Sequence, residues 1–205
     1  MRVGVLASGA GSNLQAILDR LHGREVQVVA VGSDRDDAPA LERARAAGVP
    51  AEVFPRAAYA DRAARDAAMA EWLAARGAEL VVLAGYMQLL SPEFLARWPL
   101  RVVNVHPALL PAFPGIRAIE QALEHGVKVF GVSVHFVDEG VDTGPIIAQR
   151  ALELPDAISA EAVREALRPL EHELLTGAVL AIARGEVQLD PEHPRRVLGG
   201  YRPGA

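Results

Sequence analysis

The chain of 205 residues contains no cysteine, and this absence excludes disulfides, thiolate nucleophiles and cysteine-based metal sites. It has no run of 18 apolar residues, and the apolar stretch at its start is too short for a signal peptide. Its formal net charge is −5, which argues against a nucleic-acid-binding surface. We therefore expect a soluble, cytoplasmic protein without membrane or nucleic-acid partners, as a monomer or a homodimer.

Hydrophobic residues make up 51% of the chain, which is enough for a sizeable core and argues against disorder. Through the first half, short apolar runs alternate with stretches of helical period. The apolar runs are residues 2–7, 26–31, 51–54, 80–84 and 101–105, and the helical stretches are 14–21, 40–47 and 61–76. This alternation predicts an α/β fold with a doubly wound, mostly parallel, Rossmann-like sheet.

The last third of the chain has a different pattern. Residues 130–137 alternate in polarity and residues 146–149 are apolar, which predicts an antiparallel hairpin with a long loop. Residues 159–184 predict a long C-terminal helix, with a break near Pro169 as an alternative. We expect an edge strand at 187–189 and an irregular tail from residue 191 onward. No repeat or linker interrupts the chain, so we expect one domain over residues 1–205.

A glycine-rich turn, residues 8–13, separates the first apolar run from the first helical stretch. This arrangement binds phosphate, because small residues let backbone N–H groups approach an anion at a helix N-terminus. Gly11, Ser12 and Asn13 are the candidate ligands, and Ser12 or Asn13 can also cap the helix. The turn lacks a third glycine and a Walker lysine, so a tight turn that needs small residues only for packing is the alternative.

Two further segments have both a structural and a ligand-binding interpretation. Arg62 and Arg65 begin the helical stretch 61–76, and the pattern alone favours solvated helix residues. An apolar exit from a strand is usually core, and it matters for binding only if a flat apolar ligand lies nearby. The exit from run 80–84 consists of Met87, Gln88, Leu89 and Leu90.

Asn104 and His106 lie two residues apart in an extended run, so their side chains leave the same face of the chain. Three prolines and Gly115 follow within nine residues, which predicts a shaped loop at the carboxyl end of a strand. Open α/β sheets bind their ligands at such strand ends. Asp142 lies in the acidic loop 138–145, and the spacing does not require it to contact His106.

Asparagine, histidine and aspartate together suit acyl transfer. Histidine is the usual acid or base near neutral pH, and an asparagine amide can donate to a developing oxyanion. A neighbouring carboxylate favours the protonated imidazole and fixes its tautomer. No serine or cysteine lies beside them in a nucleophile elbow, which favours direct attack by a bound amine or water. A His-Pro turn can also be purely structural, and isolated histidines do not make a zinc site.

Residues 4–13, 104–115 and 132–149 resemble the phosphoribosylglycinamide formyltransferase family, the folate-dependent formyltransferases of purine biosynthesis. The similarity runs over almost the whole chain, with the motifs in the family's order and spacing. The resemblance implies transfer of a formyl group from 10-formyltetrahydrofolate to the amine of glycinamide ribonucleotide, with no metal. It implies a nucleotide- or phosphate-binding half over about residues 1–100 and a catalytic, folate-binding half over about 101–190.

The resemblance also implies roles for individual residues. The catalytic residues would be Asn104, His106 and Asp142. The substrate phosphate and ribose would be contacted by Gly11, Ser12, Asn13, Arg168 and Glu171. The folate would be contacted by Arg62, Met87, Gln88, Leu89, Leu90 and Asn104. Residues that support the site without touching substrate would be His135 and Gly115. Arg168 stands where the family often has lysine, and Ala108 where it usually has serine.

In the implied reaction the substrate amine attacks the formyl carbon. Asn104 and protonated His106 would stabilise the oxyanion, and His106 would help move a proton to the departing folate N10. Two alternatives stay open. One is a 10-formyltetrahydrofolate hydrolase, with water as the acceptor. The other is a non-catalytic nucleotide-binding regulator on the same sheet, which would leave the Asn-His-Asp set unexplained.

Overall fold

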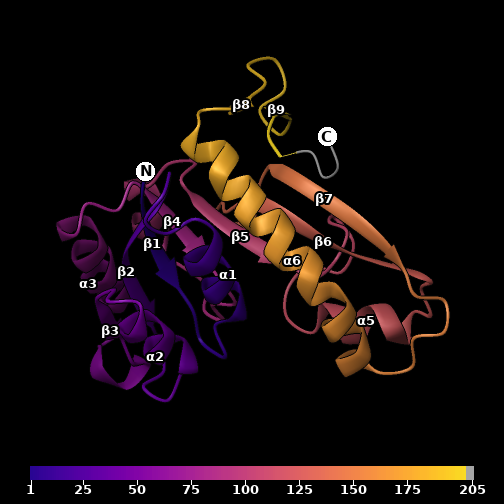
Figure 1. The fold of residues 1–205 in the computed structure, drawn as a ribbon, viewed down its shortest axis with the longest axis horizontal. Coiled ribbons are helices and arrows are strands. Elements are labelled where there is room, and N and C mark those ends of the chain that lie inside the picture. Colours follow the sequence, from indigo (N-terminus) through magenta and orange to yellow (C-terminus); the bar gives the residue numbers. More distant parts are fainter. Residues whose placement is uncertain (202–205) are drawn as a thin grey trace. The chain divides into compact units, whose positions relative to one another are not determined.

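The computed structural model describes residues 1–201 (Figure 1). Seven strands are hydrogen-bonded in the order β3-β2-β1-β4-β5-β6-β7, and β8 and β9 form a separate pair. The predicted α/β sheet, mostly parallel with an antiparallel hairpin and a long helix near its end, is confirmed. The chain divides into two compact units, Met1–Asn104 and a second unit that starts at Val105.

The first unit consists of parallel strands joined by helices. Its elements are β1 (Arg2–Leu6), α1 (Ser12–Arg20), β2 (Gln27–Ser33), α2 (Pro39–Ala46), β3 (Ala51–Val53), α3 (Arg62–Ala75), β4 (Leu80–Leu83), α4 (Pro92–Arg97) and β5 (Val102–His106), which ends in the second unit. The pairings from β3 through β5 are all parallel, and β4 is buried along its whole length. Burial on both faces explains why these strands are continuous apolar runs in the sequence.

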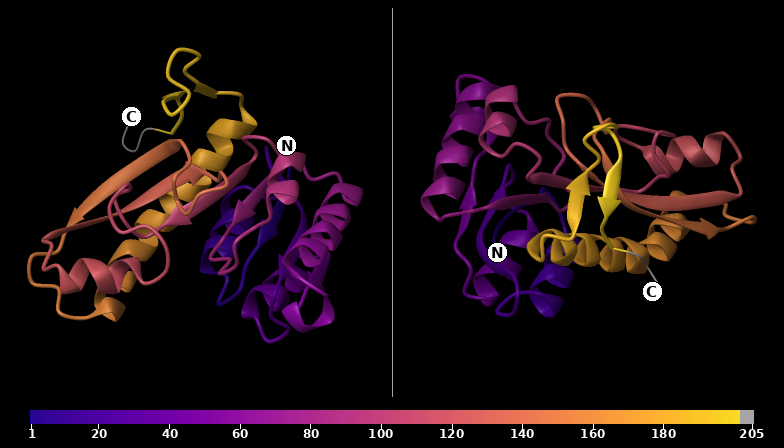
Figure 2. Two further views of the ribbon diagram at one scale, coloured as in Figure 1. Left: turned by 180° about the vertical axis from the view of Figure 1, so that it is seen from behind. Right: turned by 90° about the horizontal axis from the view of Figure 1, so that it is seen from above.

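The direction of strand addition reverses between β1 and β4. Helices α1 and α2 contact each other, as do α3 and α4. Right-handed crossovers put these two pairs on opposite faces of the sheet (Figure 2). The segments that follow β1 and β4 therefore emerge side by side at the carboxyl edge, which is where sheets of this kind bind ligands.

Helix α1 begins differently from the sequence prediction. Its N-cap is Gly11, with φ of 73°, and no side chain caps the first turn. The expectation that Ser12 or Asn13 caps the helix is therefore wrong, because both are already helical. The position needs glycine, since a Cβ on Gly11 would lie 2.8 Å from the Ala40 Cα atom. In contrast, Ser91 caps α4 by accepting from Phe94 N–H, with Pro92 at the first helical position.

The second unit contains the hairpin and the long helix. Its elements after β5 are α5 (Ala118–Glu124), β6 (Val129–Phe136), β7 (Ile146–Glu153), α6 (Ala160–Ala183), β8 (Val187–Leu189) and β9 (Val197–Gly199). Strands β6 and β7 are antiparallel as predicted, with an irregularity in register between Val134 and His135. Helix α6 contacts both strands and α5.

Helix α6 continues through Pro169 without a break. Its buried residues lie on both sides of the proline, Val163 and Leu167 before it and Leu174 and Leu175 after it. Burial on both sides of the proline, together with the packing of α6 against the hairpin, offsets the hydrogen bond that proline removes. None of the helices within residues 1–201 is long and apolar enough to cross a membrane.

The tail differs from the sequence prediction in two respects. Residues 187–189 are not an edge strand of the main sheet, because β8 pairs with β9 in a sheet of its own (Figure 2). The chain after residue 191 is therefore not irregular throughout. The backbone N–H of Asp190 donates to Arg196 O at 2.8 Å and closes the turn between the two strands. The predicted irregular structure of residues 202–205 lies outside the described residues.

Candidate active site

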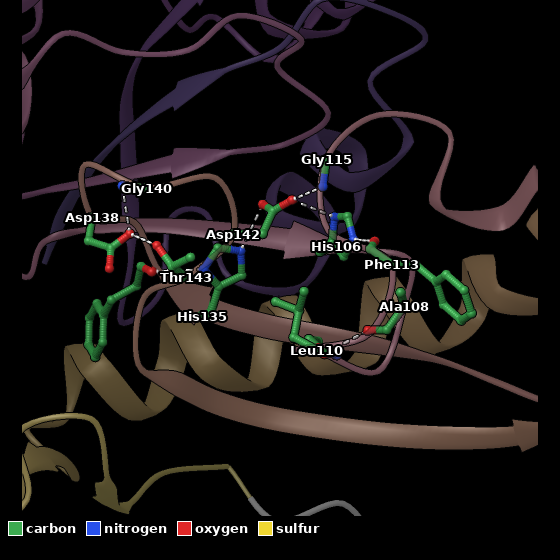
Figure 3. Close-up of polar contacts among 12 residues, drawn as sticks. His106, Ala108, Leu110, Phe113, Gly115, His135, Asp138, Gly140, Asp142 and Thr143 are labelled. Carbon is green, nitrogen blue, oxygen red and sulfur yellow. Dashed lines mark hydrogen bonds and ion pairs between the residues drawn. The ribbon is translucent and has the colours of Figure 1, made fainter. Parts of the chain in front are cut away.

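Strand β5 delivers two polar side chains to its carboxyl end. Asn104 is half-buried and His106 is 4% exposed, and their i and i+2 positions put both on one face of the strand. The loop after His106 folds back so that Phe113 O lies 2.8 Å from the Nε2 atom of His106 (Figure 3). Strand β5 fixes the start of this loop, and the imidazole of His106 contacts the loop near its end, at Phe113 O.

Asp142 contacts His106 even though 36 residues separate them in the sequence. Its Oδ2 atom lies 3.3 Å from His106 Nδ1, and its Oδ1 atom lies 3.4 Å from His135 Nε2 (Figure 3). The backbone N–H of Gly115 donates to Oδ2 at 2.7 Å. Four sequence-predicted residues, His106, Gly115, His135 and Asp142, therefore form one cluster, which we call the His106 cluster.

The loop that carries Asp142 is held by its own polar groups and by one arginine from outside the loop. Asp138 Oδ1 accepts from Thr143 Oγ1 at 2.6 Å and from Gly140 N–H at 3.1 Å. Arg195, in the turn before β9, donates from Nη2 to Thr143 O at 2.8 Å. Asp142 itself has φ of 53°, a left-handed conformation that aspartate tolerates better than most residues. The carboxylate is thus fixed by a backbone geometry that spacing alone does not reveal.

The acidity of Asp142 follows from its surroundings. Burial opposes ionisation, but the hydrogen bond from His135, the Gly115 N–H and the adjacent imidazole charges outweigh it and lower the pKa of Asp142 to about 2. The carboxylate is ionised at neutral pH. Both ring nitrogens of His106 face acceptors, Asp142 on one side and Phe113 O on the other, so a protonated imidazole can donate to both.

The pKa of Asp142 predicts an acid-dependent loss of stability. Because its pKa in the folded chain lies below the ordinary value of 3.8, its charge stabilises the fold above about pH 4, and this contribution is lost as pH falls toward 2. Urea unfolding should show wild type more stable than Asp142→Asn by at most about 2 kcal/mol at pH 7. The difference should narrow below pH 4 and should be absent for exposed Asp156→Asn. A difference that stays constant down to pH 2.5 would contradict the assignment.

A pocket of about 380 Å³ lies in the first unit, between the start of α3 and the segment after β4. Its lining consists of Arg56, Tyr59, Ala60, Asp61, Arg62, Arg65, Met87, Gln88 and Leu89. Leu90 follows this segment but does not line the pocket. Met87 is 65% and Leu89 57% exposed, so the interpretation of this exit as core is wrong for both. The exposed guanidiniums of Arg56 and Arg62 and the exposed apolar side chains suit a ligand that combines a flat apolar part with negative groups.

Arg65 is not a solvated helix residue, whereas Arg62 is exposed. The Arg65 side chain is 2% exposed and donates from Nε and Nη2 to Asp66 Oδ1 at 3.0 and 2.7 Å. The other oxygen of Asp66 accepts from Ser91 N–H at 2.6 Å. The fold tolerates this buried pair because each charge is matched and hydrogen-bonded. The only sign of this buried pair in the sequence is that Arg65 and Asp66 are adjacent. The helical pattern takes no account of such an adjacency.

The glycine-rich turn is anchored by Ser8, a residue that the sequence did not single out. Ser8 donates from its backbone N–H to Gly85 O at 3.1 Å. Its hydroxyl donates to Asp34 Oδ1 at 2.5 Å and accepts from Met87 N–H at 2.9 Å. The turn after β1 and the pocket segment after β4 are therefore joined through one serine. Ser12 is half-buried, whereas Gly11 and Asn13 are buried.

Gly11 allows a direct test of the turn geometry. Both Gly11 and Gly23 have positive φ, but only at Gly11 does an added Cβ meet backbone, at 2.8 Å. We expect Gly23→Ala to cost about 1–2 kcal/mol from the left-handed conformation alone, and Gly11→Ala to cost clearly more. Urea unfolding of the two variants measures the difference. Equal losses would mean that the Ala40 contact does not restrict the turn.

The remaining predicted residues lie on α6. Arg168 is exposed and Glu171 is half-buried, and their spacing of three places them on the same side of the helix. Within residues 1–201, no group of three or more histidine, aspartate or glutamate side chains is arranged to hold a metal ion.

A formyl transferase family profile matches residues 1–179. The chain belongs to the formyl transferase family. This membership makes it a group-transfer enzyme, a transferase.

Individual members of the formyl transferase family are similar over most of the chain. The phosphoribosylglycinamide formyltransferase of Bacillus subtilis strain 168 is 43% identical over 170 residues, 82% of this chain and 87% of that protein. Its counterpart from Mycobacterium tuberculosis strain H37Rv is 46% identical over 183 residues, 89% of this chain and 85% of that protein. The crystal structure of glycinamide ribonucleotide transformylase 1 from Symbiobacterium toebii has a TM-score of 0.92 and 49% identity. That comparison covers 97% of this chain and 93% of that chain.

Proposed function

We propose that this formyl transferase moves the formyl group of 10-formyltetrahydrofolate to the amine of glycinamide ribonucleotide. The relatives named above carry that acceptor in their names. The observation that carries the proposal is the His106 cluster, in which an ionised carboxylate contacts an imidazole at the end of β5, two residues after Asn104. An amide and a protonated imidazole are the groups that formyl transfer to an amine needs.

The first chemical step forms a carbon–nitrogen bond. The amine of glycinamide ribonucleotide attacks the formyl carbon, and the carbonyl oxygen becomes an oxyanion. Asn104 donates its amide N–H to this oxygen, and His106 donates its Nε2–H, for which the oxyanion replaces Phe113 O as the acceptor while Nδ1 stays toward Asp142. Asp142 keeps the imidazole oriented and balances its positive charge, because the carboxylate stays ionised at neutral pH.

The second step breaks the bond between the formyl carbon and folate N10. The oxyanion re-forms the carbonyl, and N10 leaves with a proton. The attacking amine loses one proton and N10 gains one. The net proton transfer therefore runs from the amine to N10 and needs no other reactant. His106 is the group that gives a proton to N10, and it recovers one from the amine. The products are formylglycinamide ribonucleotide and tetrahydrofolate.

The binding roles are assigned residue by residue. We assign the phosphate of the ribonucleotide to the turn at Gly11, Ser12 and Asn13, where a helix N-terminus meets small residues. Arg168 and Glu171 on α6 are assigned to the phosphate and ribose. Folate is assigned to the pocket beside Arg62 and to Asn104. The exposed Met87 and Leu89 suit its flat rings, and the guanidiniums suit its carboxylates.

A simple assay separates this proposal from its two alternatives. Consumption of 10-formyltetrahydrofolate is followed by absorbance, with and without glycinamide ribonucleotide. The proposal predicts turnover only when the ribonucleotide is present. Turnover without any acceptor would instead make the protein a hydrolase, and no turnover in either mixture would leave a nucleotide-binding regulator.

Arg62 provides a test of the folate pocket. Its side chain lines the pocket at an exposed position at the start of α3, where a guanidinium can reach a bound carboxylate. We expect Arg62→Ala to raise the KM for 10-formyltetrahydrofolate about tenfold or more, with kcat nearly unchanged, because a charge-assisted hydrogen bond to substrate is lost. Arg45→Ala, which removes another exposed helix arginine, is the control. An unchanged KM would remove Arg62 from the folate site.

A further inference from the structure

A polar pair lies next to the loop that follows His106 but touches none of the residues assigned to substrates. Ser133 on β6 and Gln149 on β7 are partners across the antiparallel ladder. Ser133 is fully buried, whereas Gln149 is exposed, with its amide hydrogen bonds partly buried. Gln149 donates from Nε2 to the hydroxyl of Ser133 at 2.8 Å. We call these two residues the Ser133–Gln149 clamp.

The clamp holds the backbone of the loop at three points. The Ser133 hydroxyl donates to Ala108 O at 2.6 Å and accepts from Leu110 N–H at 3.0 Å. Gln149 Nε2 also donates to Leu110 O at 2.9 Å. A serine hydroxyl has one hydrogen and two lone pairs, and here Ala108, Leu110 and Gln149 use all three. The loop backbone is therefore satisfied by side chains of the hairpin rather than by water, in a region where Ala108 and Leu110 are buried.

Packing at the same place reinforces the clamp. A Cβ added to Gly131, two residues before Ser133 on β6, would lie 2.5 Å from Leu109 Cδ2 and 2.6 Å from Arg150 O. The hairpin thus accommodates the Leu109 side chain only because residue 131 is glycine. Three consecutive loop residues are therefore fixed. Residues 108 and 110 are held by hydrogen bonds, and residue 109 is held by packing against Gly131.

The two ends of the clamped loop meet at the catalytic imidazole. Residues 108–110 form its middle, His106 precedes it, and Phe113 O contacts His106 Nε2 at the far side (Figure 3). The same strand, β6, also carries His135, which contacts Asp142. We propose that the Ser133–Gln149 clamp positions His106: by fixing residues 108–110 it keeps Phe113 O on Nε2 and holds Nδ1 toward Asp142. This inference rests on the proposed function only for its effect on turnover.

The test uses two variants of equal shape. Ser133→Val and Ser133→Thr differ in one hydroxyl, and both suit a strand. We expect Ser133→Val to lower kcat about tenfold or more through misplacement of His106, with KM for both substrates changed less than about twofold. It should also shift the ring nitrogen resonances of His106, identified by their loss in His106→Asn. Ser133→Thr should restore both readouts to near wild type.

The second variant does not depend on a buried substitution. Gln149→Met removes the donor at an exposed position, and we expect the same two changes at smaller amplitude. Gln188→Met on β8 is its control. The clamp is rejected if Ser133→Val or, should that variant not fold, Gln149→Met leaves both kcat and the His106 resonances at wild-type values. The clamp is also rejected if Ser133→Val and Ser133→Thr lower kcat equally. The resonances need no substrate, so they test the clamp even if wild type fails to formylate glycinamide ribonucleotide.

Discussion

Replacing His106 by alanine should lower kcat at least about a hundredfold, because the variant loses both a proton donor and a partner for the oxyanion. The fold should survive, since the clamp and the ladder that surround the loop do not use the imidazole. KM for both substrates should change much less than kcat, because the lost interactions form mainly in the transition state. Steady-state kinetics with both substrates measures the effect.

The matched control is His193→Ala, which removes an exposed histidine from the turn between β8 and β9. It should turn over like wild type. Circular dichroism and thermal unfolding establish that His106→Ala is folded. Near-wild-type turnover in a folded His106→Ala variant would contradict the catalytic role of His106.

Asp142→Asn should also lower kcat at least about a hundredfold, although it preserves the shape of the side chain. The reason is the loss of a charge that contacts His106 Nδ1 at 3.3 Å and sets which nitrogen carries a proton. In a chain that already carries His106→Ala, adding Asp142→Asn should lower kcat hardly any further, because the two residues act as one unit. The double variant therefore separates action through His106 from an independent effect.

The pH dependence of kcat adds a second check on Asp142. Its pKa of about 2 means that it remains ionised from pH 5 to pH 9, so no limb of the profile in that range arises from its titration. Glu139→Gln, which removes another carboxylate from the same loop, is the control and should leave kcat unchanged. If the losses from His106→Ala and Asp142→Asn simply multiply, Asp142 does not act through His106.

Much of the fold was predictable because its strands are buried on both faces. Continuous apolar runs and helical period located β1, β4, β5 and α6 to within a few residues. The same logic placed Asn104 and His106 on one face of β5, since side chains alternate along a strand. These features depend on local sequence, which is why local patterns reveal them.

The features that local patterns did not reveal depend on long-range contacts, and Asp142 entered the candidate site only through the family resemblance. Residues 36 positions apart meet at Asp142 because the hairpin closes and the backbone there is left-handed, and neither fact has a local signature. Arg65 is buried because the Asp66 carboxylate compensates its charge, and Ser91 N–H satisfies the other oxygen of Asp66. Helical period describes only which face of the helix Arg65 occupies. The N-cap is glycine because a Cβ at position 11 would clash with Ala40 in the next helix. Ser133 and Gln149 become visible only once β6 and β7 are in register.

The most direct test of formyl transfer follows the carbon itself. The protein is supplied with glycinamide ribonucleotide and with 10-formyltetrahydrofolate that carries carbon-13 in its formyl group. The products are then separated, and their masses are measured by mass spectrometry. The proposed reaction predicts the label in formylglycinamide ribonucleotide, in amounts equal to the tetrahydrofolate formed, and its disappearance in His106→Ala. Label recovered as free formate, with the ribonucleotide unchanged, would contradict it.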